Sequence, residues 1–92
     1  MKRYQVILKD QARYDLKKLL KSEPKTYQKA LKLIAELYEH PYEGTGKPEP
    51  LIGNRKGEWS RRISQKHRLV YEVNDTEIIV LVITAYGHYD DK

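Results

Sequence analysis

Four short stretches of the sequence carry side chains that a small packed domain does not need for folding. They contain Glu49 between two prolines, two arginines in basic runs (Arg62 and Arg68), and the pair His88-Tyr89 near the C-terminal end. A carboxylate can act as a general base, and an imidazole, with an unperturbed pKa of about 6.5, can act as a general acid. Guanidinium groups match phosphate oxygens and, unlike lysine, do not donate a catalytic proton. These residue types favour acid–base chemistry at a phosphate ester.

The positive charge of the chain is concentrated around the same stretches. The 92 residues include 18 Lys and Arg and 13 Asp and Glu, a net charge of +5. Residues 47–68 hold seven basic and two acidic residues, and the charges of the other segments balance. Such a local excess is typical of a surface that binds a polyanion, although a solvated loop and edge strand would carry the same charge. The further candidates for nucleic-acid contacts are Lys47, Arg55, Lys56, Arg61 and Lys66.

The composition excludes several classes of protein. The chain has no Cys, and its three His are scattered without ligand spacing, so we expect no disulfide, no metal and no cofactor. No apolar stretch approaches the roughly 20 residues that span a bilayer, and no long apolar run follows the first residues. We therefore expect a cytoplasmic protein without a membrane partner. A chain of this length has room for a single domain, residues 1–92.

Hydrophobic periodicity predicts a strand followed by two helices. Residues 3–9 alternate in polarity, as a strand does, and two helical patterns follow, the first ending before Pro24 and the second before Pro41. Their apolar stripes comprise Ala12, Leu16, Leu19 and Leu20 in the first helix, and Tyr27, Ala30, Leu31, Ile34, Leu37 and Tyr38 in the second. Residues 41–57 hold three of the four Pro and four of the five Gly, which predicts a long irregular connection.

Alternation returns after this connection and predicts a hairpin. Residues 59–64 and 68–73 form its strands, and a turn with an odd number of residues, such as Gln65-Lys66-His67, places Arg62 beside Arg68 on one face. Residues 78–83 form an unbroken apolar run typical of a central strand. The resulting order, β-α-α-β-β-β, predicts an α+β fold with an antiparallel sheet and both helices on one face. The uncovered face would then display the two arginines.

Four motifs carry a resemblance to a known family. GTGKPEPL (44–51), EWSRRI (58–63), KHRLVY (66–71) and HY (88–89), in this order and spacing, resemble the YoeB/Txe toxins of bacterial toxin–antitoxin pairs, within the RelE-type superfamily. The resemblance covers essentially the whole chain. It implies a RelE-like fold and a ribosome-dependent endoribonuclease that cuts mRNA in the ribosomal A site and is held inactive by a YefM- or Phd-like antitoxin. One departure is Gly87 directly before the His-Tyr pair; another is the tail after it, residues 90–92.

The resemblance also implies the site residues, matching the catalytic positions of the family to Glu49, Arg62, Arg68, His88 and Tyr89. RNA supplies its own nucleophile, the 2′-OH, so cleavage without a metal needs a base, an acid and positive charge at the pentacovalent phosphate. We assign Glu49 as the base, His88 as the acid and the two arginines as the groups that stabilise the phosphate. Tyr89 would stack on a base or hydrogen-bond the phosphate.

The same residues have structural interpretations, and the chain has alternative functions. Glu49 would be a solvated loop carboxylate, and the two arginines would pair with Glu58 or Glu72 across the hairpin. Trp59 is interpreted as a core anchor and His67, at the turn, as structural. The competing functions are a non-catalytic nucleic-acid binder and a ParE-like toxin directed at gyrase. The sequence does not specify codon preference, the identity of the antitoxin, or whether the protein is a monomer or a homodimer.

Overall fold

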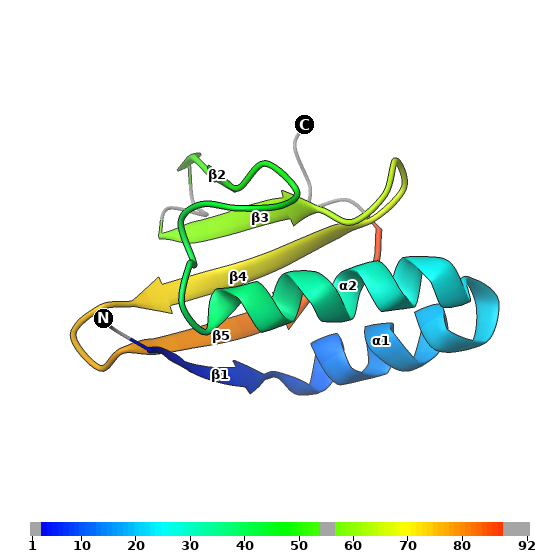
Figure 1. The fold of residues 1–92 in the computed structure, drawn as a ribbon, viewed down its shortest axis with the longest axis horizontal. Coiled ribbons are helices and arrows are strands. Elements are labelled where there is room, and N and C mark those ends of the chain that lie inside the picture. The colour runs from blue at the N-terminus through cyan, green and yellow to red at the C-terminus, as the bar shows by residue number, and fades with distance from the viewer. Residues whose placement is uncertain (1–2, 54–56, 88–92) are drawn as a thin grey trace.

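The computed structural model describes residues 3–53 and 57–87. Within these residues the elements are β1 (Gln5–Leu8), α1 (Asp10–Ser22), α2 (Pro24–Leu37), β2 (Glu49–Pro50), β3 (Glu58–Arg62), β4 (Arg68–Asn74) and β5 (Ile79–Thr84). Figure 1 shows the two helices as a pair beside a single twisted sheet. The predicted α+β fold is confirmed. Neither of the helices in this described part of the chain is both long and apolar enough to cross a membrane.

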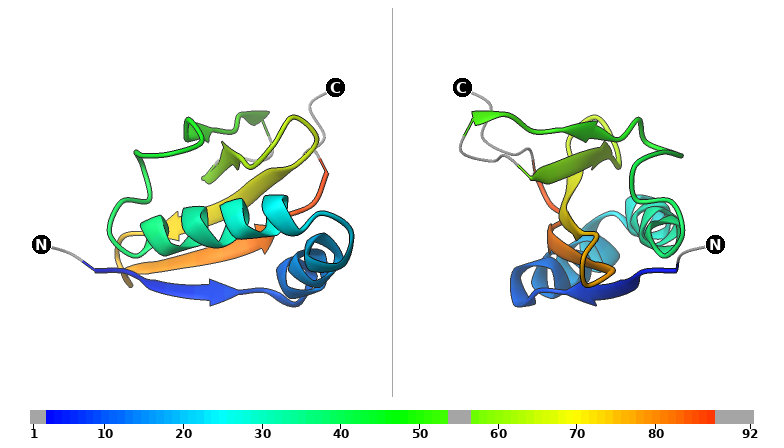
Figure 2. Two further views of the ribbon diagram at one scale, coloured as in Figure 1. Left: turned by 45° about the vertical axis from the view of Figure 1, so that its right-hand side comes forward. Right: turned by 90° about the vertical axis from the view of Figure 1, so that its left-hand side faces the viewer.

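The sheet is mixed, where the sequence predicted antiparallel pairing throughout. Its strand order is β1-β5-β4-β3-β2, and β1 runs parallel to β5 while the other pairs are antiparallel. A parallel pair needs a long crossover, which the intervening helices and strands supply. The two views in Figure 2 show β1 at the edge of the sheet beside β5. Alternation within residues 3–9 predicts which side chains face the core, but it does not predict the direction of the neighbouring strand.

The core lies between one face of the sheet and the facing sides of the helices. Its buried members are Tyr4, Ala12, Leu16, Leu19, Ala30, Leu33, Ile34, Leu37, Ile63, Leu69, Tyr71, Val80, Val82 and Ala85. Trp59 packs against this cluster, as predicted for a core anchor. Leu20 and Leu31 are predicted as stripe members but are exposed, at 49% and 39%. Each lies one position along the helix from a buried residue, and consecutive helical side chains diverge by about 100°.

Strands β3 and β4 form the predicted hairpin, with the predicted parity but a longer turn, because β3 ends at Arg62 and residues 63–67 connect the strands. Trp59 pairs with Tyr71, and Arg62 pairs with Arg68 at the turn. The turn is closed by a bond from the backbone N–H of Ile63 to the carbonyl of His67, at 3.0 Å. Because paired residues project to the same face, the two arginines lie side by side on the face opposite the core. We call residues 58–74 the arginine hairpin.

Candidate active site

The predicted base meets a predicted arginine at the edge of the sheet. Glu49 lies in β2 and is the register partner of Ser60 on β3, so its side chain shares the face of Arg62 and Arg68. Arg68 Nη1 lies 3.5 Å from Glu49 Oε2. The Glu49 side chain is 53% exposed and the Arg68 side chain 16% exposed, so a ligand can reach this ion pair from solvent. A strand of two residues is too short for its alternation to be recognised in the sequence.

Arg62 and Arg68 place two positive charges opposite each other across the hairpin. Like charges in directly paired positions destabilise a sheet. Glu49, which comes from β2, balances the charge of Arg68. Arg62 is exposed, so its charge remains at the surface beside this pair. A bound phosphate would relieve the repulsion and use both guanidinium groups.

The backbone of each arginine also holds a glycine from a distant segment. The N–H of Arg62 donates to the carbonyl of Gly46 at 2.8 Å, and the N–H of Arg68 donates to the carbonyl of Gly87 at 2.9 Å. Gly46 lies three residues before Glu49, and Gly87 comes directly before His88. The arginine hairpin therefore joins the chain segments that lead to the predicted base and to the predicted acid. His88 and Tyr89 themselves lie outside the described residues.

Both glycines adopt a backbone conformation that other residues rarely tolerate. The φ angle is +86° at Gly46 and +74° at Gly87. A Cβ at Gly46 would come within 2.9 Å of the carbonyl oxygen of Arg62, whereas a Cβ at Gly87 would meet nothing within 4 Å. Gly87 thus occurs where the chain enters the left-handed region beside Arg68.

Arg61 does not lie on the surface with the other predicted nucleic-acid contacts. Its side chain is 0% exposed, because Arg61 alternates with Arg62 and projects to the core face. Its guanidinium donates to carbonyls of the connection after α2, those of His40, Glu43 (2.8 Å) and Thr45 (3.3 Å). A guanidinium without exposed surface cannot contact RNA, so the prediction of an RNA contact at Arg61 is corrected to a structural role.

Glu36 at the end of α2 completes the network around Arg61. Arg61 Nη1 lies 2.8 Å from Glu36 Oε1, and Thr45 donates to the same carboxylate through its N–H (2.9 Å) and its hydroxyl (2.6 Å). Burial favours the neutral form of Glu36, but the hydrogen bonds from Thr45 and Arg61 outweigh it and hold the pKa of this carboxyl below its ordinary value. The ion pair of Arg61 with Glu36 and their hydrogen bonds thus hold the irregular connection in place as far as Thr45.

The other predicted basic contacts divide into two groups. Lys47 and Lys66 are exposed, at the ends of the connection and of the hairpin turn, where a polyanion could reach them. Arg55 and Lys56 lie outside the described residues. Among residues 3–53 and 57–87, no group of three or more His, Cys, Asp or Glu side chains is placed to hold a metal ion.

His67 is buried at the hairpin turn, in agreement with its predicted structural role. It is 3% exposed, and its ring lies against that of Tyr86 with 4.3 Å between centroids. Nε2 lies 2.9 Å from Glu23 Oε2, and Nδ1 accepts the N–H of Gly87 at 2.8 Å. The hydrogen bond to His67 holds the pKa of the Glu23 carboxyl below its usual range. Sequence spacing could not reveal these partners, which lie 44 and 20 residues away.

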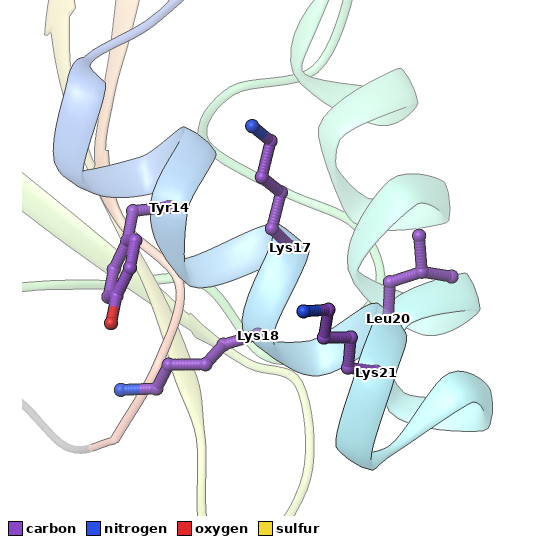
Figure 3. A pocket seen from close by; sticks show the side chains of 5 residues that line it. All are labelled: Tyr14, Lys17, Lys18, Leu20 and Lys21. Carbon is purple, nitrogen blue, oxygen red and sulfur yellow. The ribbon is translucent and has the colours of Figure 1, made fainter.

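A groove on α1 is a second basic surface that the charge count did not reveal. Figure 3 shows its lining residues, Tyr14, Lys17, Lys18, Leu20 and Lys21. Lys18 Nζ lies 5.4 Å from the centre of the Tyr14 ring and 4.0 Å from that of Tyr86. Acidic residues elsewhere balance these lysines in the total, so only their spacing along one helix could have indicated the groove. Through Lys18, α1 contacts the segment that follows β5.

The comparisons of this chain with known proteins agree on one family. Residues 8–89 match the family described as a YoeB-like toxin of bacterial type II toxin-antitoxin systems. The chain is 47% identical over 70 residues to Toxin YoeB of Mycobacterium bovis and to Toxin RelK of Mycobacterium tuberculosis, which covers 76% of this chain and 80% of each relative.

Solved structures agree with the sequence relatives. The YoeB/ParE toxin of Agrobacterium tumefaciens superposes with a TM-score of 0.85 at 33% identity, covering 92% of this chain and 99% of that one. A chain of the YoeB dimer of Staphylococcus aureus has a TM-score of 0.81 at 34% identity, and a chain of the YoeB-YefM complex from the same organism has a TM-score of 0.78 at 34% identity. Each S. aureus comparison covers 95% of this chain and 99% of the other.

Proposed function

The chain belongs to the family of YoeB-like toxins of bacterial type II toxin–antitoxin systems, and on this premise we propose that it is a ribosome-dependent endoribonuclease that cleaves mRNA without a metal. The substrate would be mRNA in the ribosomal A site. Lys47 and Lys66, together with Arg55 and Lys56, would contribute contacts to RNA. A ribosomal substrate would also place the protein in the cytoplasm.

The proposed reaction uses the 2′-OH of the RNA as the nucleophile. Glu49 removes the proton of the 2′-OH as its oxygen bonds to the adjacent phosphorus, and Arg62 and Arg68 stabilise the charge on the pentacovalent phosphate. His88 donates a proton to the 5′ oxygen as the bond from phosphorus to that oxygen breaks. The products are a 2′,3′-cyclic phosphate and a free 5′-OH. Tyr89 contacts the base or the phosphate.

One observation carries this proposal: Arg68 is bonded to both segments that lead to the proposed base and acid. Its side chain pairs with Glu49 at 3.5 Å, and its N–H donates to the carbonyl of Gly87 at 2.9 Å. Gly87, which directly precedes His88 in the sequence, is therefore bonded to a residue whose side chain contacts the carboxylate. This arrangement supports a shared site for the carboxylate, guanidinium and imidazole around one phosphodiester.

The test measures cleavage of mRNA on programmed ribosomes, by mapping new 5′ ends. Glu49→Gln and His88→Ala should each lower the cleavage rate by roughly 10²- to 10⁴-fold, the usual contribution of a general base or acid. Glu77→Gln is the matched control, because Glu77 is an exposed carboxylate remote from the hairpin turn. Full cleavage by both variants would exclude the assignment. New DNA damage without new mRNA ends would instead favour a toxin directed at gyrase.

We propose further that the protein is neutralised by an antitoxin of the YefM type. The S. aureus relative forms a complex with YefM and also forms a dimer. The site face and the α1 groove of this chain are both basic, which fits a partner with an acidic segment that folds on binding. Such a segment would cover the arginines and remove them from RNA.

Co-expression with the adjacent open reading frame tests the partner. We expect a stable complex whose mass, measured by light scattering after gel filtration, exceeds that of the free chain or of its homodimer. High expression of the unaltered chain alone without arrest of growth would contradict the need for a neutralising partner.

A further inference from the structure

Three consecutive residues after β5, Ala85–Gly87, are each held by a contact from elsewhere in the fold. The N–H of Ala85 donates to Asp15 Oδ2 at 2.9 Å. Asp15 lies on α1 and is only 3% exposed, although it carries a carboxyl group. The ring of Tyr86 contacts both Lys18 Nζ and the imidazole of His67. Gly87 is bonded through its N–H to His67 and through its carbonyl to Arg68. The chain therefore reaches residue 88 from a fixed position.

His67 is central to this arrangement, because both of its ring nitrogens are engaged. A backbone N–H can only donate, so Nδ1 must accept the N–H of Gly87 (2.8 Å) and carries no hydrogen. The hydrogen of the neutral ring is then on Nε2, which donates to Glu23 Oε2 at 2.9 Å. Glu23 therefore selects the tautomer that leaves Nδ1 free to accept. Neither the proposed base nor the proposed arginines require this buried imidazole.

We propose that His67 is a positioning residue, whose neutral imidazole, oriented by Glu23, holds Gly87 beside Arg68 and so sets the point from which His88 and Tyr89 continue. The inference rests on the proposed function of His88 as the acid. A displacement of about 1 Å at a reacting group can lower a rate by about 10²-fold. A contact remote from the substrate can in this way affect catalysis without touching RNA.

Two substitutions separate the functions of the two ring nitrogens. In His67→Asn the side-chain oxygen can replace Nδ1 as the acceptor for Gly87, and the contact with Glu23 is lost. In His67→Gln the longer amide can reach Glu23, and the N–H of Gly87 loses its acceptor. Both variants bury an amide of similar polarity, so each is the matched control for the other.

Cleavage on programmed ribosomes should distinguish the variants. We expect His67→Gln to lower kcat by about 10- to 100-fold with a smaller change in KM, because positioning acts on the chemical step more than on ribosome binding. His67→Asn should remain close to the unaltered protein. Glu23→Gln changes a partly exposed side chain at the junction of the helices. It should lower kcat by an intermediate amount, because residue 23 then no longer determines which ring nitrogen of His67 carries the hydrogen.

Hydrogen exchange of the Gly87 amide provides a readout that does not depend on activity. It is measured by NMR in the Glu49→Gln background, which limits toxicity. Exchange should be slow with His67 in place and in the His67→Asn variant, because both supply an acceptor, and fast in His67→Gln. Thermal unfolding of the same samples reports whether each variant is folded. Nitrogen chemical shifts of the His67 ring should show the hydrogen on Nε2, and a mixture of tautomers in Glu23→Gln.

The outcomes separate this inference from the proposed function. Full cleavage by folded His67→Gln, or equal loss in His67→Gln and His67→Asn, would overturn the positioning role. Slow exchange of the Gly87 amide in His67→Gln would do the same. Full cleavage by His88→Ala would overturn the proposed acid instead, and the exchange data would still decide whether His67 holds Gly87.

Discussion

The two segments that reach the arginine hairpin are held by different chemistry. Residues 41–46 are fixed by the buried, charged guanidinium of Arg61 and the carboxylate of Glu36. In residues 85–87 the groups that hold Gly87 are neutral, an imidazole and a backbone N–H, while the Asp15 carboxylate accepts the N–H of Ala85 and a lysine lies over the ring of Tyr86. Both segments end at a glycine whose carbonyl accepts from an arginine of the hairpin. Gly46 and Gly87 are thus held against the hairpin in the same way, but the segments before them are stabilised by interactions of unequal strength.

This difference indicates how strongly each segment is coupled to folding. Removing one partner of a buried ion pair is costly, because the charge that remains is held out of water without compensation. A neutral hydrogen bond contributes only about 0.5–1.5 kcal/mol to stability. Damage to the first segment should therefore lower the stability of the protein strongly, whereas damage to the second should mainly shift the position of residues 85–87.

The largest expected effect is on stability, from Arg61→Ala. This change removes the guanidinium that donates to Glu36 and to three carbonyls, and should lower the free energy of unfolding by about 3–5 kcal/mol. Urea denaturation followed by circular dichroism measures it. Arg62→Ala, one residue away on the exposed face, is the control and should change stability by no more than about 0.5 kcal/mol. Equal losses in the two variants would show that Arg61 is not the residue that fixes the first segment.

The next largest effect is on activity, from Arg68→Ala. It removes the guanidinium beside Glu49 but keeps the backbone N–H that bonds Gly87, so both segments should stay in place. We expect the single-turnover cleavage rate on ribosomes to fall by about 10²- to 10³-fold, as when one donor to a transition state is lost. A folded variant that cleaves at the normal rate would show that the ion pair serves structure alone.

Patterns of period two and turn parity were sufficient to predict the hairpin and the placement of Arg62 and Arg68 on one face, but not the length of the turn. The same parity also indicates that Arg61 faces the core, because its position is odd, as are those of Trp59 and Ile63. The local excess of positive charge in residues 47–68 led to the opposite prediction, an RNA contact at Arg61. Parity was the stronger guide here because the connection after α2 offers carbonyls and a carboxylate that satisfy a buried guanidinium.

Contacts between distant segments could not be predicted in this way. The hydrogen bonds of His67 to Glu23 and Gly87 span 44 and 20 residues, and no local pattern encodes them. The parallel pairing of β1 with β5 is a contact of the same kind. Glu49 was identified as a site residue through the motif around it, whereas its place in β2 depends on pairing with β3.

The two glycines provide a smaller test of the same contrast. Gly46→Ala combines a left-handed backbone, which costs about 1–2 kcal/mol, with a clash against the carbonyl of Arg62, so its loss of stability should be larger than that of Gly87→Ala. Gly87→Ala meets open space and should cost only the backbone preference, about 1–2 kcal/mol. Thermal unfolding of both variants measures the difference. If the order were reversed, the second segment would be the more tightly constrained one.

The smallest effect is the pH dependence of the stability that Glu36 contributes in the first segment. The pKa of Glu36 is lower in the folded protein than its ordinary value of 4.5, so below pH 4.5 the unfolded chain takes up a proton that the folded protein does not. The stabilisation by ionised Glu36 is thus complete above pH 4.5 and is lost as the pH falls through the folded pKa. Urea denaturation of the unaltered protein and of Glu36→Gln should give stabilities that differ at about pH 7 and converge toward about pH 3. A difference that stays constant over this range would mean that the shape of the Glu36 side chain, rather than its charge, fixes residues 41–46.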